Sequence, residues 1–204
     1  ADLALASIPD TDPARSSLNE IVNAAATAAD LARQMLAYSG RSNYEILPLD
    51  LNEVIVELMH MLEVSISKKA VLKFRLADEL PKIMADAAQI RQILMNLITN
   101  ASEAIGDVSG VISITTGAMY CDASYLNTTE PTAELSDDIY VYVEISDTGC
   151  GMSESAKSQL FEPFFTTKST GRGLGLSSVL GIVRGHKGAV KVYTESGEGT
   201  TFKV

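Results

Sequence analysis

An aspartate at the end of a predicted strand is the first residue whose position could do chemistry. Apolar side chains alternate with others along residues 139–147 (IYVYVEISD), so one face of this strand is predicted to meet the core. The apolar positions are Ile139, Val141, Val143 and Ile145. Asp147 follows the same alternation and is predicted to point inward, where a carboxylate needs good hydrogen-bond donors. Gly149 and Gly151 then permit close backbone approach, so a flat ligand that bears an amine, such as adenine, would satisfy Asp147. A simple turn that ends the strand is the alternative interpretation.

Two asparagines four residues apart form the second candidate group. Asn96 and Asn100 lie in a predicted helix that begins near Asp86, and their spacing places both side chains on one face. The side-chain carbonyl oxygen of Asn is a neutral, hard ligand that suits Mg²⁺ already bound to phosphate. Two polar residues on a half-exposed helix face are the alternative.

A glycine-rich stretch before a predicted helix is the third candidate group. Residues 168–176 read KSTGRGLGL and run into the predicted helix 174–184. Glycines before a helix leave backbone N–H groups accessible, and the positive end of the helix dipole favours an anion there. The glycine spacing is not that of a P-loop, and no strand directly precedes it, as a dinucleotide fingerprint would require. A flexible surface loop is the alternative.

The order of these motifs along the chain resembles that of one protein family. The segments concerned are QILMNLITNASEAI, DTGCGM, FEPFF, GRGLGL and GEGTTF. In this order they resemble the N box, first glycine box, F box, second glycine box and last strand of the catalytic, ATP-binding domain of bacterial sensor histidine kinases. The resemblance covers about residues 51–204 and implies a protein-histidine kinase.

The resemblance implies a role for each matching residue around the adenine and the metal. Asp147 would accept a hydrogen bond from the exocyclic amine of ATP, in a pocket shaped by Gly149 and Gly151. Thr200 would support that pocket through water. The resemblance further implies that Asn100 binds Mg²⁺ and that Asn96 is a polar contact on the phosphate side.

The second glycine box would form a mobile lid over ATP. The residues that would present backbone to the phosphates or act as its hinge are Gly171, Gly173, Gly175 and Leu176. Lys168 and Arg172 would neutralise phosphate charge. The F-box phenylalanines are expected to pack in the core and anchor the lid; they are Phe161, Phe164 and Phe165.

Two positions in the N box bear on the reaction. Related ATPases of this superfamily, such as gyrase and the large heat-shock chaperone, carry a Glu general base where Asn96 stands. Without a carboxylate there, activation of water is poor, so the resemblance implies a phosphoryl donor rather than a hydrolase. Glu103 is a departure, because many sensor kinases have a basic residue at that position. The departure removes one expected phosphate contact.

The resemblance also implies a phosphoacceptor histidine, which neither histidine of the chain matches. His60 and His186 are interpreted as packing or surface residues. Residues 18–40 resemble the second helix of a dimerisation hairpin, so the acceptor is expected upstream of Ala1. The expected division is a hairpin remnant at 1–45 and an ATP-binding domain at 46–204. Helix 18–40 would pair in a homodimer, and the phosphoryl group would pass from the His to a response-regulator receiver domain.

These groups need helices and strands to position them. Helices are predicted at 18–40, 51–66, 86–101 and 174–184, and strands at 71–76, 111–119, 139–147, 189–194 and 200–204. Ser17 is a candidate N-cap for the first helix, and Asp86 with Gln89 is a capping arrangement for the third. The order predicts a two-layer α/β sandwich, in which helices cover one face of a mixed sheet.

Charge and hydropathy limit the possible partners. The 204 residues carry 26 acidic and 16 basic side chains, a net charge of −10, which argues against binding nucleic acid or anionic membrane. No apolar run approaches the roughly 20 residues of a membrane span, so we expect no membrane segment. With only two cysteines, a cytoplasmic setting is expected. Residues 163–194 are an exception to the acidic character, since they hold basic residues and no acidic one: Lys168, Arg172, Arg184, Lys187 and Lys191.

Two other functions remain open at this point. One is an ATP-binding regulatory module that acts through dimer contacts and transfers no phosphate. The other is a Ser/Thr protein kinase of the same superfamily, although the hairpin-like helix before residue 51 weighs against it.

Overall fold

The structure is a computed structural model that describes residues 5, 8–9, 12–22, 25, 45–65, 69–131, 135–168, 171 and 173–204. Most of the predicted helix 18–40 and the predicted phosphate contact Arg172 therefore lie outside the described residues.

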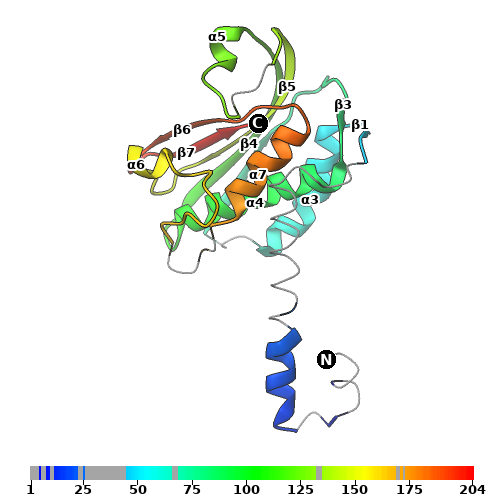
Figure 1. Ribbon diagram of the computed structural model, residues 1–204, viewed down its shortest axis with the longest axis vertical. Helices are drawn as coiled ribbons and strands as arrows, with labels where there is room; N and C mark the ends of the chain where they lie inside the picture. Colours follow the sequence, from blue (N-terminus) through cyan, green and yellow to red (C-terminus); the bar gives the residue numbers. More distant parts are fainter. Residues whose placement is uncertain are drawn as a thin grey trace.

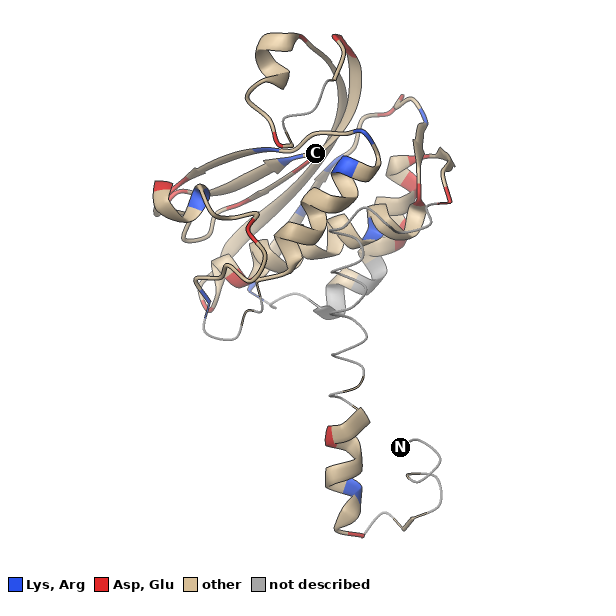
Figure 2. Ribbon diagram, in the orientation of Figure 1, with Lys and Arg blue, Asp and Glu red and all other residues tan. Residues whose placement is uncertain are grey.

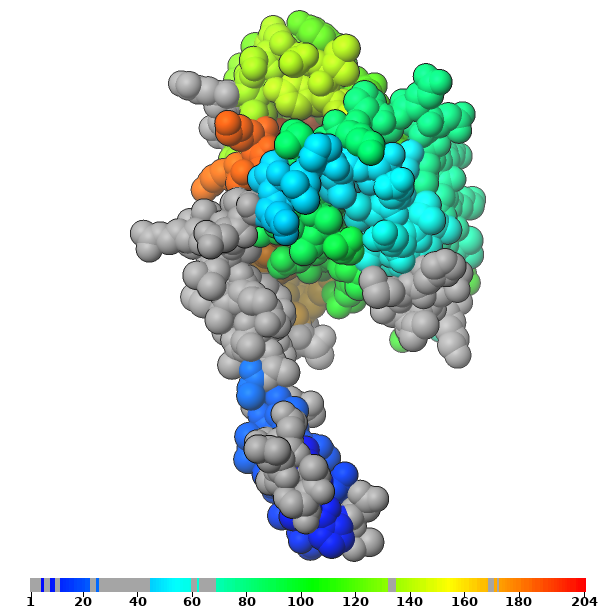
Figure 3. Space-filling view, turned by 90° about the vertical axis from the view of Figure 1, so that its right-hand side faces the viewer, coloured from blue at the N-terminus to red at the C-terminus, as the bar shows by residue number. Residues whose placement is uncertain are grey.

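The described N-terminal helix begins earlier than predicted. Residues 14–22 are helical, and the backbone N–H of Ala14 donates to the Asp12 carboxylate at 2.8 Å. Pro13 stands between them, at a position where a helix loses nothing by lacking an N–H. Asp12 is therefore the cap, and the prediction of Ser17 was wrong. The segment lies apart from the α/β body in two views at right angles (Figures 1 and 3).

A five-stranded mixed sheet forms one layer of the body. Its strands are β2 (Ala70–Arg75), β4 (Gly110–Cys121), β5 (Asp138–Asp147), β6 (Lys191–Glu195) and β7 (Gly199–Lys203). The spatial order is β2-β4-β5-β7-β6; β2 and β4 run parallel, and the other pairs are antiparallel. A separate antiparallel pair, β1 (Leu47–Leu49) and β3 (Ile83–Ala85), was not predicted.

Helices form the second layer (Figure 1). They are α3 (Leu51–Ser65), α4 (Ala87–Ile105) and α7 (Gly175–Gly185), and the short helices α5 (Ala123–Leu126) and α6 (Glu154–Lys157) lie outside this layer. Figure 3 shows α3 and β1, in cyan, on the face of the body that is turned to the viewer. The arrangement confirms the predicted two-layer α/β sandwich.

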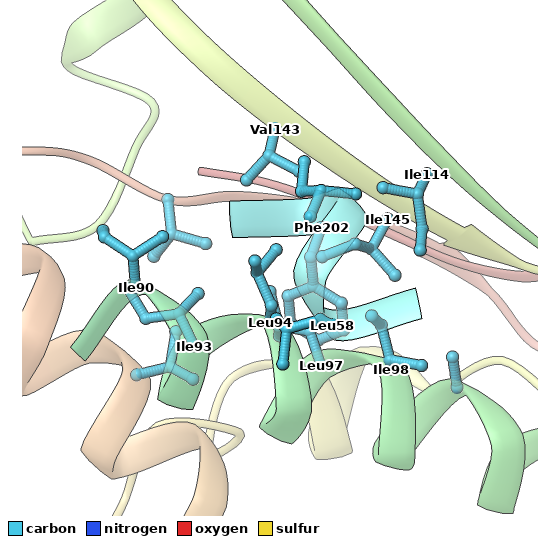
Figure 4. Packing of buried hydrophobic residues seen from close by; sticks show 14 of the residues in the cluster. Leu58, Ile90, Ile93, Leu94, Leu97, Ile98, Ile114, Val143, Ile145 and Phe202 are labelled. Carbon is cyan, nitrogen blue, oxygen red and sulfur yellow. The ribbon is translucent and has the colours of Figure 1, made fainter. Parts of the chain in front are cut away.

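The core lies between α4 and the sheet (Figure 4). Leucine and isoleucine side chains of α4 meet apolar side chains of the central strands, and Leu97 is fully buried. The main partners are Ile93, Leu94, Leu97 and Ile98 on α4, with Ile114, Val143, Ile145 and Phe202 on the sheet. Each such side chain contributes about 1.5–3 kcal/mol when it is fully buried. The helix that carries Asn96 and Asn100 is therefore firmly fixed to the sheet.

The alternation along β5 is confirmed over its second half. Val143, Ile145 and Asp147 are buried, with exposures of 5%, 1% and 7%. Ile139 is 65% exposed, so its predicted place in the core was wrong. The reason is geometric: β7 and the following Val204 pair with β5 over residues 143–147, and the start of β5 runs on beside β4 alone.

The N-terminus of α4 is capped as predicted, with one difference. The Asp86 carboxylate accepts hydrogen bonds from the N–H groups of Ala88 (2.9 Å) and Gln89 (3.1 Å). The N–H of Asp86 donates to His186 Nε2 at 3.0 Å, and Gln89 Oε1 is buried with no hydrogen-bond partner among the described residues. His186, at the C-terminus of α7, thus joins the two helices that border the candidate site.

Candidate nucleotide-binding site

Asp147 ends β5 between two neighbouring strands. Its register partners are Ile112 on β4 and Thr200 on β7. One carboxylate oxygen accepts the N–H of Gly149 at 2.8 Å. Burial raises the pKa of Asp147 above its usual value, and the backbone N–H groups of Gly149 and Thr200, followed by the charge of Lys168, offset part of this rise. The result is a buried hydrogen-bond acceptor at the end of β5, the middle strand of the sheet.

The glycines of the first glycine box allow the backbone to pack closely. A Cβ on Gly149 would lie 2.6 Å from the carbonyl carbon of Ala104, near the end of α4. The next N–H, that of Cys150, donates to the Ala104 oxygen at 3.1 Å. Gly151 has a φ of +61°, and its Cβ would lie 1.9 Å from the Glu195 oxygen. Gly149 thus holds the Asp147 turn against α4, one turn of the helix from Asn100, and Gly151 packs the turn against the connection between β6 and β7.

Thr200 connects to this turn through a residue that the sequence did not indicate. Its hydroxyl lies 3.0 Å from the hydroxyl of Thr194 on β6. Thr194 Oγ1 also accepts the N–H of Met152, in the first glycine box, at 2.9 Å. Thr194 lies in no recognisable motif, and only the β6–β7 pairing brings it opposite Thr200.

Asn96 and Asn100 lie on one face of α4, as predicted, and face the start of α7. Asn96 Nδ2 donates to the carbonyl oxygen of Gly175 at 3.3 Å. A Cβ on Gly175 would lie 3.8 Å from Asn96 Cγ and 3.9 Å from Asn100 Nδ2, which is ordinary contact distance. Both asparagines are half-buried. The two asparagines thus lie on a half-buried helix face that meets the start of α7, and their role toward a ligand stays a prediction.

No side chain of the described residues caps the N-terminus of α7. Leu174 occupies the N-cap position and makes no side-chain hydrogen bond to the first turn. The N–H groups of a first helical turn have no partner within their helix, and they carry the positive end of its dipole. This uncapped end begins at Gly175, beside Asn96 and Asn100, so an anion can be bound there.

The F box and the second glycine box pack on each other. The N–H of Phe164 donates to the oxygen of Gly173 at 2.8 Å. Gly173 has a φ of +67°, and a Cβ there would lie 2.4 Å from the carbonyl carbon of Phe164. Phe161 packs against the core, but Phe164 is 60% exposed with a φ of 69°, so its predicted core position was wrong. Phe165 is half-buried.

The remaining lid residues place a basic group beside α4. Lys168 Nζ donates to Asn100 Oδ1 at 3.3 Å and forms an ion pair with Glu103. The N–H of Gly171 donates to the Lys168 oxygen at 3.3 Å. Leu176 is half-buried against the core, which positions the first turn of α7. Glu103 is thus more than a missing phosphate contact, because it holds a basic lid residue.

The histidines and the charged surface add no second site among the described residues. His186 accepts the N–H of Asp86 and lies 2.9 Å from the Ile182 oxygen through Nδ1, whereas the His60 side chain lies outside the described part. No cluster of three or more His, Cys, Asp or Glu residues that could hold a metal occurs in the described ranges. None of their helices is long and apolar enough to cross a bilayer. In the view of Figure 2 the basic residues are scattered over several elements.

Residues 85–204 match the family described as histidine kinase-, DNA gyrase B-, and HSP90-like ATPase. The chain belongs to this ATPase family. The match begins at the end of β3 and takes in all the residues of the candidate site.

Comparisons with individual proteins point to histidine kinases within the family. The chain is 35% identical, over its whole length, to sensor kinase CckA of Brucella abortus (strain 2308). Two solved structures each match 98% of the chain. They are ShkA in complex with AMPPNP (TM-score 0.72, 24% identity) and histidine kinase ThkA in complex with response regulator protein TrrA (TM-score 0.62, 28% identity). The chain spans 21%, 40% and 53% of the lengths of CckA, ShkA and ThkA respectively.

Proposed function

We propose that this chain is the ATP- and Mg²⁺-binding kinase core of a longer two-component sensor histidine kinase. The observation that carries the proposal is the uncapped N-terminus of α7 beside Asn96 and Asn100. Family membership and the similarity to CckA and ThkA support it. No observation favours the regulatory module or the Ser/Thr kinase.

The adenine is proposed to bind at Asp147. The carboxylate is buried, so the exocyclic amine of adenine would donate to it away from competing water. Gly149 and Gly151 let the turn after Asp147 pack closely on its neighbours, and the backbone N–H of Thr200 supports the Asp147 carboxylate. Hydrogen-bond recognition of this kind favours adenine over bases without an amine at that position.

The phosphates are proposed to bind between α4 and the start of α7. The N–H groups after Gly175 would donate to phosphate oxygens, while the lid residues Lys168 and Arg172 neutralise charge. Asn100 suits Mg²⁺, because its Oδ1 already accepts a hydrogen bond from a cationic group in this structure. Bound Mg²⁺ would neutralise charge on the phosphate oxygens and help to align the γ-phosphoryl group for transfer.

The reaction is proposed to be transfer of the γ-phosphoryl group to a histidine. The bond from γ-phosphorus to the ADP oxygen breaks, and a bond from phosphorus to an imidazole nitrogen forms. Asn96 donates to a backbone oxygen and offers no carboxylate to activate water, so hydrolysis is slow by comparison. An Asp on a response-regulator receiver domain would then take the phosphoryl group, in line with the ThkA–TrrA complex.

The rest of the proposed organisation concerns the N-terminal part. We infer that residues 1–45 are a remnant of a dimerisation hairpin whose phosphoacceptor His lies upstream, and that residues 46–204 are the ATP-binding domain. Helix 18–40 would pair in a homodimer, and the domain would act in the cytoplasm.

Phosphoryl transfer in trans tests the proposal. The chain is incubated with γ-labelled ATP, Mg²⁺ and a separate His-bearing hairpin from a related sensor kinase. Acid-labile, base-stable label on the hairpin is expected, and a hairpin with His replaced by Gln is the control. Nucleotide binding without any transfer would favour the regulatory module, and label on Ser or Thr would favour the other kinase class.

A further inference from the structure

We propose that Thr194 is a positioning residue of the nucleotide site, whose hydroxyl holds the side chain of Thr200 in place without touching the nucleotide. The inference rests on the proposed function, because Thr200 belongs to the proposed adenine pocket. It adds to that pocket a residue of β6, a strand that supplies none of the proposed nucleotide contacts.

The hydroxyl of Thr194 is the meeting point of three segments. It accepts the N–H of Met152 at 2.9 Å and donates to the carbonyl oxygen of Gly199 at 3.1 Å. It also lies 3.0 Å from the hydroxyl of Thr200. Met152 belongs to the first glycine box, and Gly199 and Thr200 begin β7. One side chain therefore joins the glycine box, β6 and β7.

The number of these partners fixes the direction of each hydrogen bond. A threonine hydroxyl has one proton to donate and two lone pairs that accept. The proton of Thr194 goes to Gly199, and one lone pair takes the N–H of Met152. The second lone pair is left for the hydroxyl proton of Thr200. A nucleotide would find no free donor or acceptor on Thr194, so this residue can influence binding only through its neighbours.

Thr200 is the neighbour that faces the proposed adenine site. It is the register partner of Asp147, and the two residues are buried, with exposures of 6% and 7%. A threonine side chain has few staggered χ1 rotamers, and the hydrogen bond to Thr194 selects one of them. Loss of this bond would allow Thr200 to leave the rotamer that it has beside Asp147.

The connection between β6 and β7 packs directly on the turn after Asp147. A Cβ on Gly199 would lie 2.0 Å from the backbone oxygen of Asp147, and the N–H of Gly197 donates to the Cys150 oxygen at 2.8 Å. Thr194 therefore lies in the packed surroundings of Asp147, where removal of its hydroxyl leaves neighbouring polar groups without a partner.

Binding of AMPPNP with Mg²⁺ tests the positioning role. Thr194→Val keeps the shape of the side chain and removes the hydroxyl, whereas Thr194→Ser keeps the hydroxyl. A single hydrogen bond typically changes an equilibrium by roughly 2- to 13-fold, and we expect Thr194→Val to weaken binding by a factor in this range. Thr194→Ser is expected to restore most of the affinity. Unchanged affinity in the Val variant, or an equal loss in the Ser variant, would overturn the proposal.

The matched control is Thr201→Val. It removes the hydrogen bond from Thr201 to the Ser146 hydroxyl (2.8 Å), which also joins two neighbouring strands, β7 and β5. Successive residues of a strand point to opposite faces, so Thr201 lies on the other face of the sheet from Thr200. Its replacement is expected to leave affinity unchanged. If it weakens binding as much as Thr194→Val does, the effect is a general loosening of the sheet and the proposal does not hold.

A Thr200→Val background shows whether Thr194 acts through Thr200. In that background Thr194→Val is expected to have no further effect on affinity. An equal loss in both backgrounds would show that Thr194 acts through Met152 instead, and it would contradict the proposal.

Three-bond couplings measured by NMR without nucleotide report the χ1 angle of Thr200. One rotamer is expected in the wild type and averaging over several in Thr194→Val. A single unchanged rotamer in the variant would mean that Thr194 does not hold Thr200. A wild-type chain that binds no nucleotide would refute the proposed function, and these couplings would still decide whether Thr194 positions Thr200.

Discussion

Replacing Asp147 by Asn should separate nucleotide recognition from stability. The amide is nearly isosteric with the carboxylate, and its oxygen can still accept the N–H of Gly149, which lies 2.8 Å away in the wild type. The negative charge that would face the adenine amine is lost. Hydrogen bonds to charged groups typically contribute about 1.5–3 kcal/mol, so affinity for AMPPNP with Mg²⁺ should fall roughly 10- to 150-fold.

Stability should not fall with affinity. Burial raises the pKa of Asp147 in the folded protein, so its ionisation opposes folding. That unfavourable effect is present above the raised pKa and disappears as the pH falls below the ordinary value of 3.8. At pH 7 the Asn variant should therefore be at least as stable as the wild type, and the difference should shrink toward pH 4.

Isothermal titration with AMPPNP and urea unfolding at pH 7 and pH 4 measure the two quantities. Unchanged affinity in the variant would refute the adenine assignment. A loss of affinity together with a loss of more than about 1 kcal/mol of stability would refute the argument that Asp147 serves the ligand and not the fold.

Three further predictions follow from the same contacts. Asn100→Ala should remove the dependence of nucleotide affinity on Mg²⁺, so that affinity in the presence of Mg²⁺ falls by about 10-fold or more. Titrations with Mg²⁺ and with EDTA measure this change, and a persisting Mg²⁺ effect would place the metal elsewhere. Asp86→Ala should lower unfolding free energy at pH 7 by about 1 kcal/mol, since the carboxylate caps α4. Although burial of Asp86 acts to raise its pKa, the N–H groups of Glu45, Gln89 and Ala88 lower the pKa overall. The stabilisation by the Asp86 cap should therefore vanish as acid protonates the carboxylate, and a stability difference that does not change with pH would contradict the cap. Leu97→Ala should cost about 2–5 kcal/mol in urea unfolding, because Leu97 is fully buried; a cost below 1 kcal/mol would contradict the packing described.

Much of the fold follows from local sequence signals. The helix of Asn96 and Asn100 was predicted from its apolar spacing and from the Asp86 cap, and the hydrogen bonds of that cap confirm it. The alternation along β5 correctly placed Asp147 in the interior. In each case the deciding interaction is between residues a few positions apart, so the sequence itself contains the information.

The features that were missed depend on residues far apart in the chain. The strands β1 and β3 have three residues each, too few for any periodicity to be visible. Thr194 becomes part of the site only because β6 pairs with β7, and Ile139 is exposed because β7 does not reach it. Lys168 meets Glu103 across 65 residues, and no local pattern reveals such a pair.

The central claim is that one site holds the adenine at Asp147 and the metal at Asn100. Replacing Mg²⁺ by paramagnetic Mn²⁺ in the complex with AMPPNP, and recording the broadening of each backbone amide signal by NMR, measures the position of the metal directly. The account predicts the strongest broadening around Asn100 and the start of α7, and weaker broadening at Gly149. Strongest broadening anywhere outside the region between α4 and α7, or none at all, would contradict it.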